Sequence, residues 1–241
     1  MIARIGPPRQ TVVIAHRTCP RDAPENSLDG IRTAASLGAD YVEIDIRRTL
    51  DGVPVLMHDP LLRRTTDSWW PVWTVTSRRL RNVRLRADGG PVPLLADVLG
   101  QLPGGLGLAI DIKDATAAAA VLAEVRRCDA LDRVLFWSQK GRAVRHLTSA
   151  QGGIEVALLR DTHTPKADER LIRDAVRWGA SAISIHEEAV KRPLLDRAKQ
   201  RGLRVYAWLQ DEPARYDVVD GRLDGVVTDW VAETRRALAR A

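Results

Sequence analysis

The stretch GLAIDIKDATAAAAVLAEVRRCDALDRVLFWSQKGRAVRHLTSAQGGIEVALL, Gly107–Leu159, decides the fold because two periodicities alternate along it. Short apolar runs predict strands at Gly107–Ile112, Arg133–Trp137 and Ile154–Leu159. The segments between them, Ala115–Arg127 and Lys140–Thr148, have the apolar spacing of helices. Strands that alternate with helices predict a parallel sheet, because each helix carries the chain back to the start of the next strand.

The same alternation continues on both sides of this stretch. Further strands are expected at Thr11–Ala15, Tyr41–Ile46, Ala182–Ile185, Leu203–Trp208 and Asp224–Thr228. Further helices are expected at Ser27–Leu37, Ala167–Trp178, Glu188–Arg201, Ala214–Val219 and Val231–Arg240. Eight main strands in 241 residues predict an α/β fold of the closed (β/α)8 barrel (TIM barrel) type, whereas a doubly wound open sheet usually has fewer strands. Because no linker or low-complexity segment interrupts the chain, residues 1–241 are interpreted as one domain.

One segment breaks the alternation. After a short strand expected at Val53–Met57, residues 59–93 contain several prolines and a Gly-Gly pair, and are interpreted as a small insertion between early barrel units. A short helix is expected to follow at Leu94–Leu99. The insertion also holds Trp69, Trp70 and Trp73, which either line the mouth of the barrel and make transient contact with a membrane or pack the insertion onto the barrel rim.

The overall charge is basic, with a formal net charge of +6 and a pI of about 9.8. One interpretation is attraction to phosphates, nucleic acid or a membrane surface. An arginine-rich composition with solvated faces is the preferred interpretation, because the arginines are spread along the chain. No run of like charges marks a nucleic-acid-binding arm, so no nucleic-acid partner is expected. No apolar stretch is long enough to span a membrane, and the N-terminus lacks the apolar core of a signal peptide. Cys19 and Cys128 are too few for a disulfide framework, so free thiols and a cytoplasmic location are expected.

Polar side chains collect where the predicted strands end, the end of a (β/α)8 barrel that carries catalytic groups. Glu43 and Asp45 lie two apart on one strand and therefore on one face, where two bare carboxylates would repel. A divalent cation such as Mg²⁺, Ca²⁺ or Mn²⁺ would relieve that repulsion, with Asp111 as a third oxygen ligand. The alternative is a set of salt bridges to neighbouring arginines.

Two basic side chains near these acids are candidates for binding a phosphate. Lys113 repeats the spacing of two from Asp111, and Arg17 lies next to His16. The alternative for both is an ordinary ion pair at the barrel rim. Asp229 follows the last predicted strand and belongs to the same functional end of the barrel.

The histidines separate into two groups. His16 and His58 each follow an apolar strand-like run and flank the acid pair, so they are candidates for proton transfer, although a lone strand-end histidine is more often structural. His186 is expected to make a structural hydrogen bond, with a substrate contact as the alternative. His146 and His163 are expected on the surface.

Several segments of the chain, taken together, resemble the glycerophosphodiester phosphodiesterase family. The resemblance covers nearly the whole chain and is densest between residues 13 and 66. The segments that carry it are Ala15-His16-Arg17, Pro24-Glu25-Asn26-Ser27, Gly38–Asp45, Asp51–Val55, His58-Asp59, Leu62–Thr66, Val92–Leu99, Ile110–Lys113 and Asp224–Asp229.

The resemblance implies a (β/α)8 barrel, a divalent metal ion and hydrolysis of glycerophosphodiesters to glycerol 3-phosphate and an alcohol. It implies that His16 and His58 are the general acid/base pair. It further implies metal binding by Glu43, Asp45 and Asp111, and phosphate contacts from Arg17 and Lys113. Trp208 is expected to form a wall for the glycerol or alcohol part, and residues 59–93 correspond to the family's insertion.

Three positions depart from the family pattern. Thr18 stands where a glycine usually follows His-Arg, and Asp111 stands where the third acid is usually glutamate. After Trp208 the sequence reads Leu209-Gln210-Asp211 in place of Thr-Val-Asn. Two alternatives to the simple diesterase therefore stay open: a lysophospholipase D-like enzyme with a longer substrate, and a catalytically silent phosphate-binding barrel. The attacking nucleophile is either water or the substrate's own glycerol 2-hydroxyl.

Overall fold

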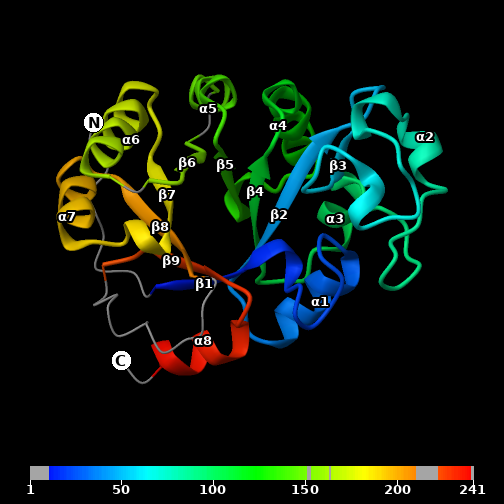
Figure 1. The fold of residues 1–241 in the computed structure, drawn as a ribbon, viewed down its shortest axis with the longest axis horizontal. Helices are drawn as coiled ribbons and strands as arrows, with labels where there is room; N and C mark the ends of the chain where they lie inside the picture. The colour runs from blue at the N-terminus through cyan, green and yellow to red at the C-terminus, as the bar shows by residue number, and fades with distance from the viewer. Residues whose placement is uncertain (1–10, 151–152, 163, 210–221, 240–241) are drawn as a thin grey trace.

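The computed structural model describes residues 11–150, 153–162, 164–209 and 222–239, and it is a closed barrel of eight parallel strands (Figure 1). Around the barrel the order is β1, β2, β4, β5, β6, β7, β8 and β9, and β9 pairs with β1 to close it. The strands are β1 (Val12–Ala15), β2 (Tyr41–Arg48), β4 (Gly107–Ile112), β5 (Val134–Ser138), β6 (Glu155–Arg160), β7 (Ala182–His186), β8 (Arg204–Leu209) and β9 (Gly225–Thr228). The predicted (β/α)8 barrel is confirmed, and the alternative of an open sheet is wrong.

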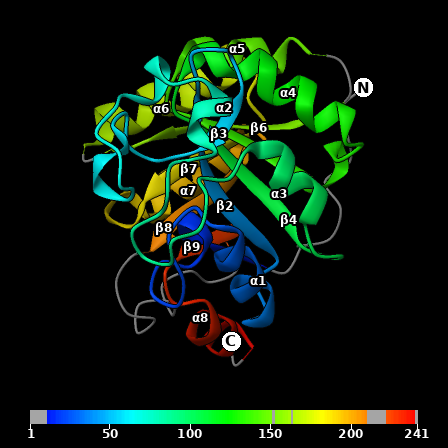
Figure 2. The same cartoon turned by 90° about the vertical axis from the view of Figure 1, so that its right-hand side faces the viewer.

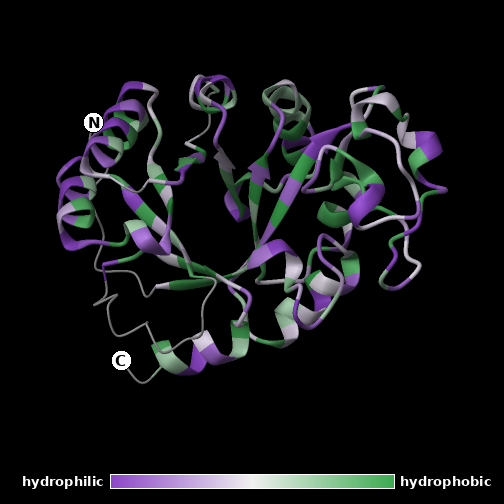
Figure 3. Ribbon diagram, in the orientation of Figure 1, coloured by the Kyte–Doolittle hydropathy of each residue, from purple (hydrophilic) through white to green (hydrophobic). Residues whose placement is uncertain are grey.

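Helices cover the outside of the barrel (Figure 1). They are α1 (Leu28–Ser36), α3 (Leu95–Gln101), α4 (Ala118–Arg127), α5 (Gly141–Thr148), α6 (Pro165–Arg177), α7 (Arg192–Gln200) and α8 (Val231–Leu238). Figure 3 shows apolar colour concentrated on the strands and polar colour on the outer helices. The main apolar core fills the layer between helices and strands, with Ile44, Ile110 and Phe136 among its fully buried members.

The inside of the barrel is also filled with side chains. Trp137 and Tyr206 meet there, with their ring centroids 5.2 Å apart. The carboxylate of Glu155 accepts hydrogen bonds from the Tyr206 hydroxyl and the Arg204 guanidinium. Glu155 and Arg204 begin β6 and β8, so this ion pair lies at the N-terminal end of the strands, opposite the end at which (β/α)8 barrels bind their ligands.

The insertion lies beside the barrel, on the right of Figure 1, and Figure 2 turns that side toward the viewer. It begins after β3 (Pro54–Leu56), which pairs antiparallel with the end of β2, and it contains the short helix α2 (Ser77–Leu80). The insertion has an apolar core of its own, formed by residues that include Leu62, Val72, Leu80 and Leu85. No helix of the described residues is long and apolar enough to cross a membrane.

The predicted element boundaries agree with the structure to within one or two residues at most positions, with one clear exception. The helix predicted at Glu188–Arg201 is wrong over its first part, because α7 begins only at Arg192. Pro193 explains the difference: proline is tolerated in the first turn of a helix but removes a hydrogen bond from its interior. The helix predicted at Ala214–Val219 and the last residue of the one predicted at Val231–Arg240 lie outside the described residues.

Candidate active site

The register of the parallel strands brings the predicted site residues together. Asp45 on β2 lies directly opposite Asp111 on β4. Ala15 on β1 pairs with both Val42 on β2 and Thr228 on β9. One residue further along, His16, Glu43 and Asp229 therefore become neighbours at the open end of the barrel.

Three carboxylates form a buried cluster at this end. Glu43, Asp45 and Asp111 are each at most 4% exposed, and one oxygen from each lies within 4.8 Å of the others. The Asn26 amide fixes Asp45, since its Nδ2 donates to Asp45 Oδ2 at 2.8 Å and its Oδ1 accepts from the Asp45 backbone N–H at 3.0 Å. The backbone N–H of Arg17 donates to Glu43 Oε2 at 2.8 Å. Neutral donors thus hold Glu43 and Asp45 in place.

The two predicted phosphate-binding cations lie against the same cluster. Lys113 Nζ is 2.8 Å from Asp45 Oδ1 and also contacts Asp111 Oδ2. Arg17 Nε is 3.5 Å from Asp45 Oδ2, and this buried nitrogen makes no hydrogen bond to the protein. The ion pairs that were the alternative interpretation of these residues are therefore present in the ligand-free protein, and a donor of Arg17 stays available for a further acceptor.

Burial and neighbouring charges shift the pKa values of the three acids in different directions. Burial and then the negative charge of Asp45 raise the pKa of Glu43 to about 8. Burial also raises the pKa of Asp111, although Lys113 opposes this shift. For Asp45 burial acts in the same direction, but Lys113 and Arg17 outweigh it and lower its pKa to about 2. Without a further cation, the cluster therefore holds a proton on Glu43 at neutral pH.

The residues present fit a divalent metal ion. Asp111 Oδ1 is buried and accepts no hydrogen bond, and Asp45 Oδ1 meets Lys113 electrostatically without hydrogen-bond geometry. Carboxylate oxygens with free lone pairs are the ligands that Mg²⁺, Ca²⁺ and Mn²⁺ prefer. A bound cation would also replace the proton on Glu43 and share the negative charge that Lys113 now neutralises. Glu43, Asp45 and Asp111 are the residues that would hold it.

Both predicted catalytic histidines are anchored in the same way. His16 Nδ1 lies 2.8 Å from Asp229 Oδ1, and His58 Nδ1 lies 2.7 Å from Asp59 Oδ1. Burial opposes charging of the His16 ring, but the hydrogen bond to Asp229 and the charge of Glu43 outweigh it and raise the pKa of His16. In each ring the second nitrogen, Nε2, is left for a ligand.

A second layer of ion pairs supports His58. Arg64 contacts Asp59 and makes two hydrogen bonds to the Glu25 carboxylate, at 2.6 and 2.7 Å. Burial opposes ionisation of Asp59, but its bonds to Arg64 and His58 outweigh this and lower its pKa. Arg64 therefore links the insertion to the loop after β1 across the partner of a candidate catalytic histidine.

The loop after β1 has unusual backbone geometry. Arg17, Thr18 and Cys19 follow one another with φ of 43°, 65° and 73°, in the left-handed region that favours glycine. Thr18 is nevertheless accommodated, because its buried hydroxyl donates to the Pro24 carbonyl and accepts from the Ser27 backbone N–H. Cys19 is a free thiol whose pKa is raised to about 12 by burial and by its hydrogen bond to Asp22, so it is not a nucleophile at neutral pH.

The other residues that the sequence singled out have different surroundings in the structure. Trp208 is the penultimate residue of β8 and faces the inside of the barrel, where its Nε1 donates to Ser184 Oγ at 2.8 Å. His186 Nδ1 accepts a long hydrogen bond of 3.5 Å from the Glu188 backbone N–H, as its expected structural role requires. His146 is exposed as predicted, whereas His163 and the pair Gln210-Asp211 lie outside the described residues.

The sequence alone assigned no role to three residues of the site. Asp229 and Asp59 orient the two histidines, and Asn26 orients Asp45. All three stand in the segments that carry the family resemblance, and Asp229 also follows a predicted strand. Their roles depend on which side chains meet across the barrel mouth, which sequence spacing does not reveal.

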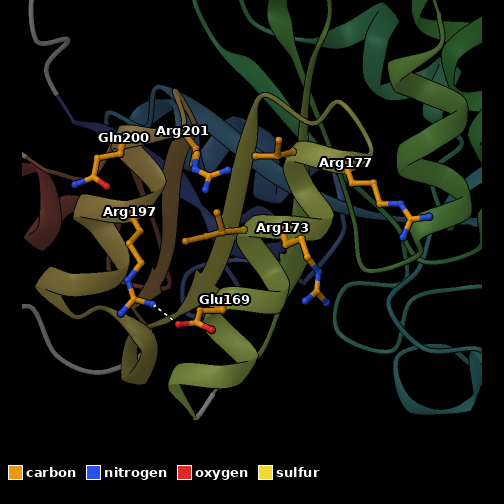
Figure 4. Close-up of a pocket in the computed structure, with 8 residues that line it drawn as sticks. Glu169, Arg173, Arg177, Arg197, Gln200 and Arg201 are labelled. Atoms are coloured by element: carbon orange, nitrogen blue, oxygen red, sulfur yellow. Dashed lines mark hydrogen bonds and ion pairs between the residues drawn. The ribbon is translucent and has the colours of Figure 1, made fainter.

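Two cavities differ in their relation to this site. One of about 580 Å³ lies between the loop after β1 and the insertion, and its lining includes Glu25 and Arg64 from the support of His58. Another of about 630 Å³ lies on the outside of the barrel between α6 and α7 (Figure 4). Its rim carries Arg173 and Arg177 from one helix and Arg197 and Arg201 from the other, and it contains none of the predicted site residues.

Known proteins match this sequence and this fold. The glycerophosphoryl diester phosphodiesterase family model matches residues 16–233. A curated relative from Mycobacterium tuberculosis, named "Probable glycerophosphodiester phosphodiesterase 2", is 32% identical over 223 residues, which are 86% of this chain and 82% of that protein. The crystal structure of a glycerophosphodiester phosphodiesterase from Agrobacterium tumefaciens superimposes with a TM-score of 0.80 at 25% identity, covering 96% of this chain and all of that one.

A third match shares the fold at lower identity. The structure of an Oleispira antarctica phosphodiesterase, in complex with the product sn-glycerol-3-phosphate, gives a TM-score of 0.84 at 22% identity and covers 95% of this chain and 97% of that one. With a family model that spans the barrel from the first candidate histidine to the last helix, the assignment is plain. The chain belongs to the glycerophosphoryl diester phosphodiesterase family, whose members are phosphodiester hydrolases.

Proposed function

We propose that this protein is a divalent-metal-dependent phosphodiesterase that hydrolyses glycerophosphodiesters to glycerol 3-phosphate and an alcohol. The observation that carries the proposal is the buried cluster of Glu43, Asp45 and Asp111 with an anchored histidine on either side, His16 and His58. Family membership supports the reaction class. The two free thiols support the expected cytoplasmic location.

The protein's own residues have separate tasks in this reaction. Arg17 and Lys113 bind the nonbridging oxygens of the phosphate, a task for which the unsatisfied Nε of Arg17 is available. One histidine accepts the proton of the nucleophile while a new P–O bond forms, and the other donates a proton to the alkoxide as the old P–O bond breaks. The metal ion, held by Glu43, Asp45 and Asp111, would supply Lewis-acid stabilisation of the negative charge that develops on the phosphate.

The anchored geometry explains why the histidines suit proton transfer. Asp229 and Asp59 each hold a ring through Nδ1, and the hydrogen bond to Asp229 helps to raise the pKa of His16. Each Nε2 then keeps one orientation toward the substrate, which lowers the entropic cost of reaching the transition state. Trp208, fixed by Ser184, is placed to form an apolar wall for the glycerol or alcohol part.

The test is turnover of glycerophosphocholine with Mg²⁺, Ca²⁺ or Mn²⁺, and then with excess EDTA. We expect choline release with at least one metal and its loss on chelation. Absence of turnover with every metal would support the catalytically silent barrel instead. Detection of a cyclic glycerophosphate by ³¹P NMR would identify the glycerol 2-hydroxyl as the nucleophile, and its absence would favour water.

A second candidate function is a lysophospholipase D-like reaction, in which the diester still carries an acyl chain. The cavity of about 580 Å³ is lined by Glu25 and Arg64, which support His58 through Asp59, and it offers space for a longer substrate. Exposed tryptophans on the neighbouring insertion supply apolar surface. Turnover of lysophosphatidylcholine at a rate comparable to glycerophosphocholine would favour this function, and a large preference for the acyl-free diester would exclude it.

A further inference from the structure

The exposed apolar side chains of this protein are unevenly distributed. Within the described residues, the large apolar side chains that face solvent are Leu50, Trp69, Trp70, Trp73 and Val176. The tryptophans are 72%, 53% and 52% exposed, and all three belong to the insertion. Leu50 lies against the same segment, because its backbone N–H donates to the Val75 carbonyl at 3.0 Å. Several large exposed apolar side chains on one segment usually mark a contact surface.

Packing of the insertion does not require these tryptophans. The insertion's own core is built from aliphatic residues, including Val72, Val75 and Leu80. The alternative by which the tryptophans pack the insertion onto the barrel rim is therefore wrong. The largest apolar side chains of the segment are left outside a core that is already complete.

The segment that bears the tryptophans is also rich in arginine. Six exposed arginines belong to this segment and form no ion pair with any carboxylate that the structure describes: Arg63, Arg78, Arg79, Arg81, Arg84 and Arg86. Arg79 lies over the Trp70 ring, with its guanidinium carbon 5.2 Å from the ring centroid. The exposed acids of the segment are only Asp67 and Asp88, so this surface is strongly positive.

This surface lies beside the candidate active site. Pro60 lies two residues after His58, and its carbonyl accepts a hydrogen bond of 3.0 Å from the Val72 backbone N–H. Leu62 in turn donates to the Trp70 carbonyl at 3.1 Å. The segment that bears the tryptophans is therefore hydrogen-bonded directly to the chain segment that follows His58.

We propose that Trp69, Trp70, Trp73 and the exposed arginines of the same segment form a docking surface for an anionic phospholipid bilayer. Indole rings favour the boundary between lipid headgroups and acyl chains, and arginines bind the phosphates of anionic lipids. The combination of protruding rings with unpaired positive charge matches such a boundary better than a protein partner, whose carboxylates would have to satisfy each arginine individually. Docking would bring the barrel mouth to a membrane that supplies phosphodiesters; this last step alone rests on the proposed function.

The experiment is co-sedimentation of the full chain with two kinds of vesicle, phosphatidylcholine alone and phosphatidylcholine with phosphatidylglycerol in equal parts. We expect binding to the anionic vesicles only, weakened by high salt. Two variants carry the test: the triple variant Trp69→Ser, Trp70→Ser, Trp73→Ser, and the charge variant Arg78→Ser, Arg79→Ser on α2. With about 1 kcal/mol per arginine near the surface, losing two should weaken partitioning roughly thirtyfold.

A matched control separates this surface from overall charge. Arg173→Ser with Arg177→Ser removes the same charge from exposed arginines of α6, on the rim of the outer cavity (Figure 4). That variant should bind vesicles nearly as well as the unaltered protein. Circular dichroism and turnover of glycerophosphocholine should be unchanged in all three variants, because none of the substituted residues belongs to the catalytic site.

Several outcomes would overturn the proposal. Failure of the unaltered chain to bind anionic vesicles, undiminished binding by the tryptophan variant, or equal loss in the α6 control would each do so. A dimer that dissociates on substitution of the tryptophans, without vesicle binding, would identify a protein interface instead. Vesicle binding without any diesterase turnover would leave docking intact and refute only the proposed function.

Discussion

The two anchored histidines of the site share one arrangement, a ring Nδ1 bonded to a carboxylate at 2.8 Å in His16 and 2.7 Å in His58. We expect His16→Ala and His58→Ala each to lower kcat by about 10²–10⁴-fold, the range that general acid/base catalysis contributes. His146→Ala, on an exposed helix position, is the matched control and should keep full activity. A folded His16→Ala or His58→Ala variant with normal turnover of glycerophosphocholine would show that its assigned role is wrong.

The protonation of Glu43 predicts a pH dependence of metal binding. Its pKa is raised from 4.5 to about 8 by burial and by Asp45, so in the metal-free protein a cation must displace a proton below that pH. The apparent metal affinity should rise by up to about tenfold per pH unit below pH 8 and then level off. Titration calorimetry in buffers of different protonation enthalpy measures both the affinity and the released proton.

The matched variant for this prediction is Glu43→Gln, which cannot release a proton. It should bind the metal more weakly and lose the pH dependence in this window. The raised pKa of Glu43 also predicts how the stability of the folded protein changes with pH. The unfolded chain loses the proton near pH 4.5 and the folded one near 8, so metal-free protein should become less stable as pH rises between them. A metal affinity that stays flat with pH would contradict the protonation of Glu43.

Among the elements, the loop after β1 and helix α1 are fitted to each other. A Cβ added at Gly30 would lie 2.3 Å from both the Thr18 carbonyl oxygen and the Thr18 Oγ1. This close approach explains how the barrel accommodates threonine where the family resemblance leads one to expect glycine. Because Gly30 of α1 has no side chain, Thr18 can occupy the space beside it.

This fit makes a prediction for stability. Gly30→Ala should lower the free energy of unfolding by about 1–3 kcal/mol, the usual cost of overpacking. The double variant Thr18→Gly, Gly30→Ala should be less destabilised than the sum of the single variants, because two of the three closest atoms belong to the Thr18 side chain. Urea unfolding of the four proteins measures the coupling. Strict additivity would mean that the two residues do not compete for space.

Elements were more predictable than their contacts. The amphipathic spacing of Leu28, Ile31 and Ala34, with Ser27 as the N-cap, predicts α1 almost to the residue. The short helix α2 inside the insertion was not predicted, since one turn of Ser-Arg-Arg-Leu has no periodicity to recognise. The late start of α7 follows from Pro193, a local signal that outweighs apolar spacing.

For the whole molecule, closure of the barrel creates the metal site. Asp45 and Asp111 come from separate strands and meet only through the register of β2 and β4, so the unfolded chain offers no such cluster. A metal at 100 times its Kd should therefore stabilise the folded protein by about 2.7 kcal/mol, with a matching rise in Tm. The control is the variant Asp45→Asn, Asp111→Asn, which should show no rise.

Calorimetry with and without EDTA checks this expectation at fixed ionic strength. A rise in Tm of equal size in the double variant would place the bound metal elsewhere on the protein. A rise in the unaltered chain together with absent turnover would separate metal binding from catalysis and favour the silent phosphate-binding barrel.

By itself, the sequence determined that the chain forms a barrel and which end of the barrel carries the candidate catalytic residues. Periodicity separates strands from helices locally, and alternation of side chains puts Glu43 and Asp45 on one face whatever surrounds them. The tertiary structure alone decided that Asp229 holds His16, that Asn26 holds Asp45, and that three tryptophans remain outside the core. These are contacts or exposures set by closure of the barrel. They depend on which distant segments meet in space, and spacing along the chain carries no information about that.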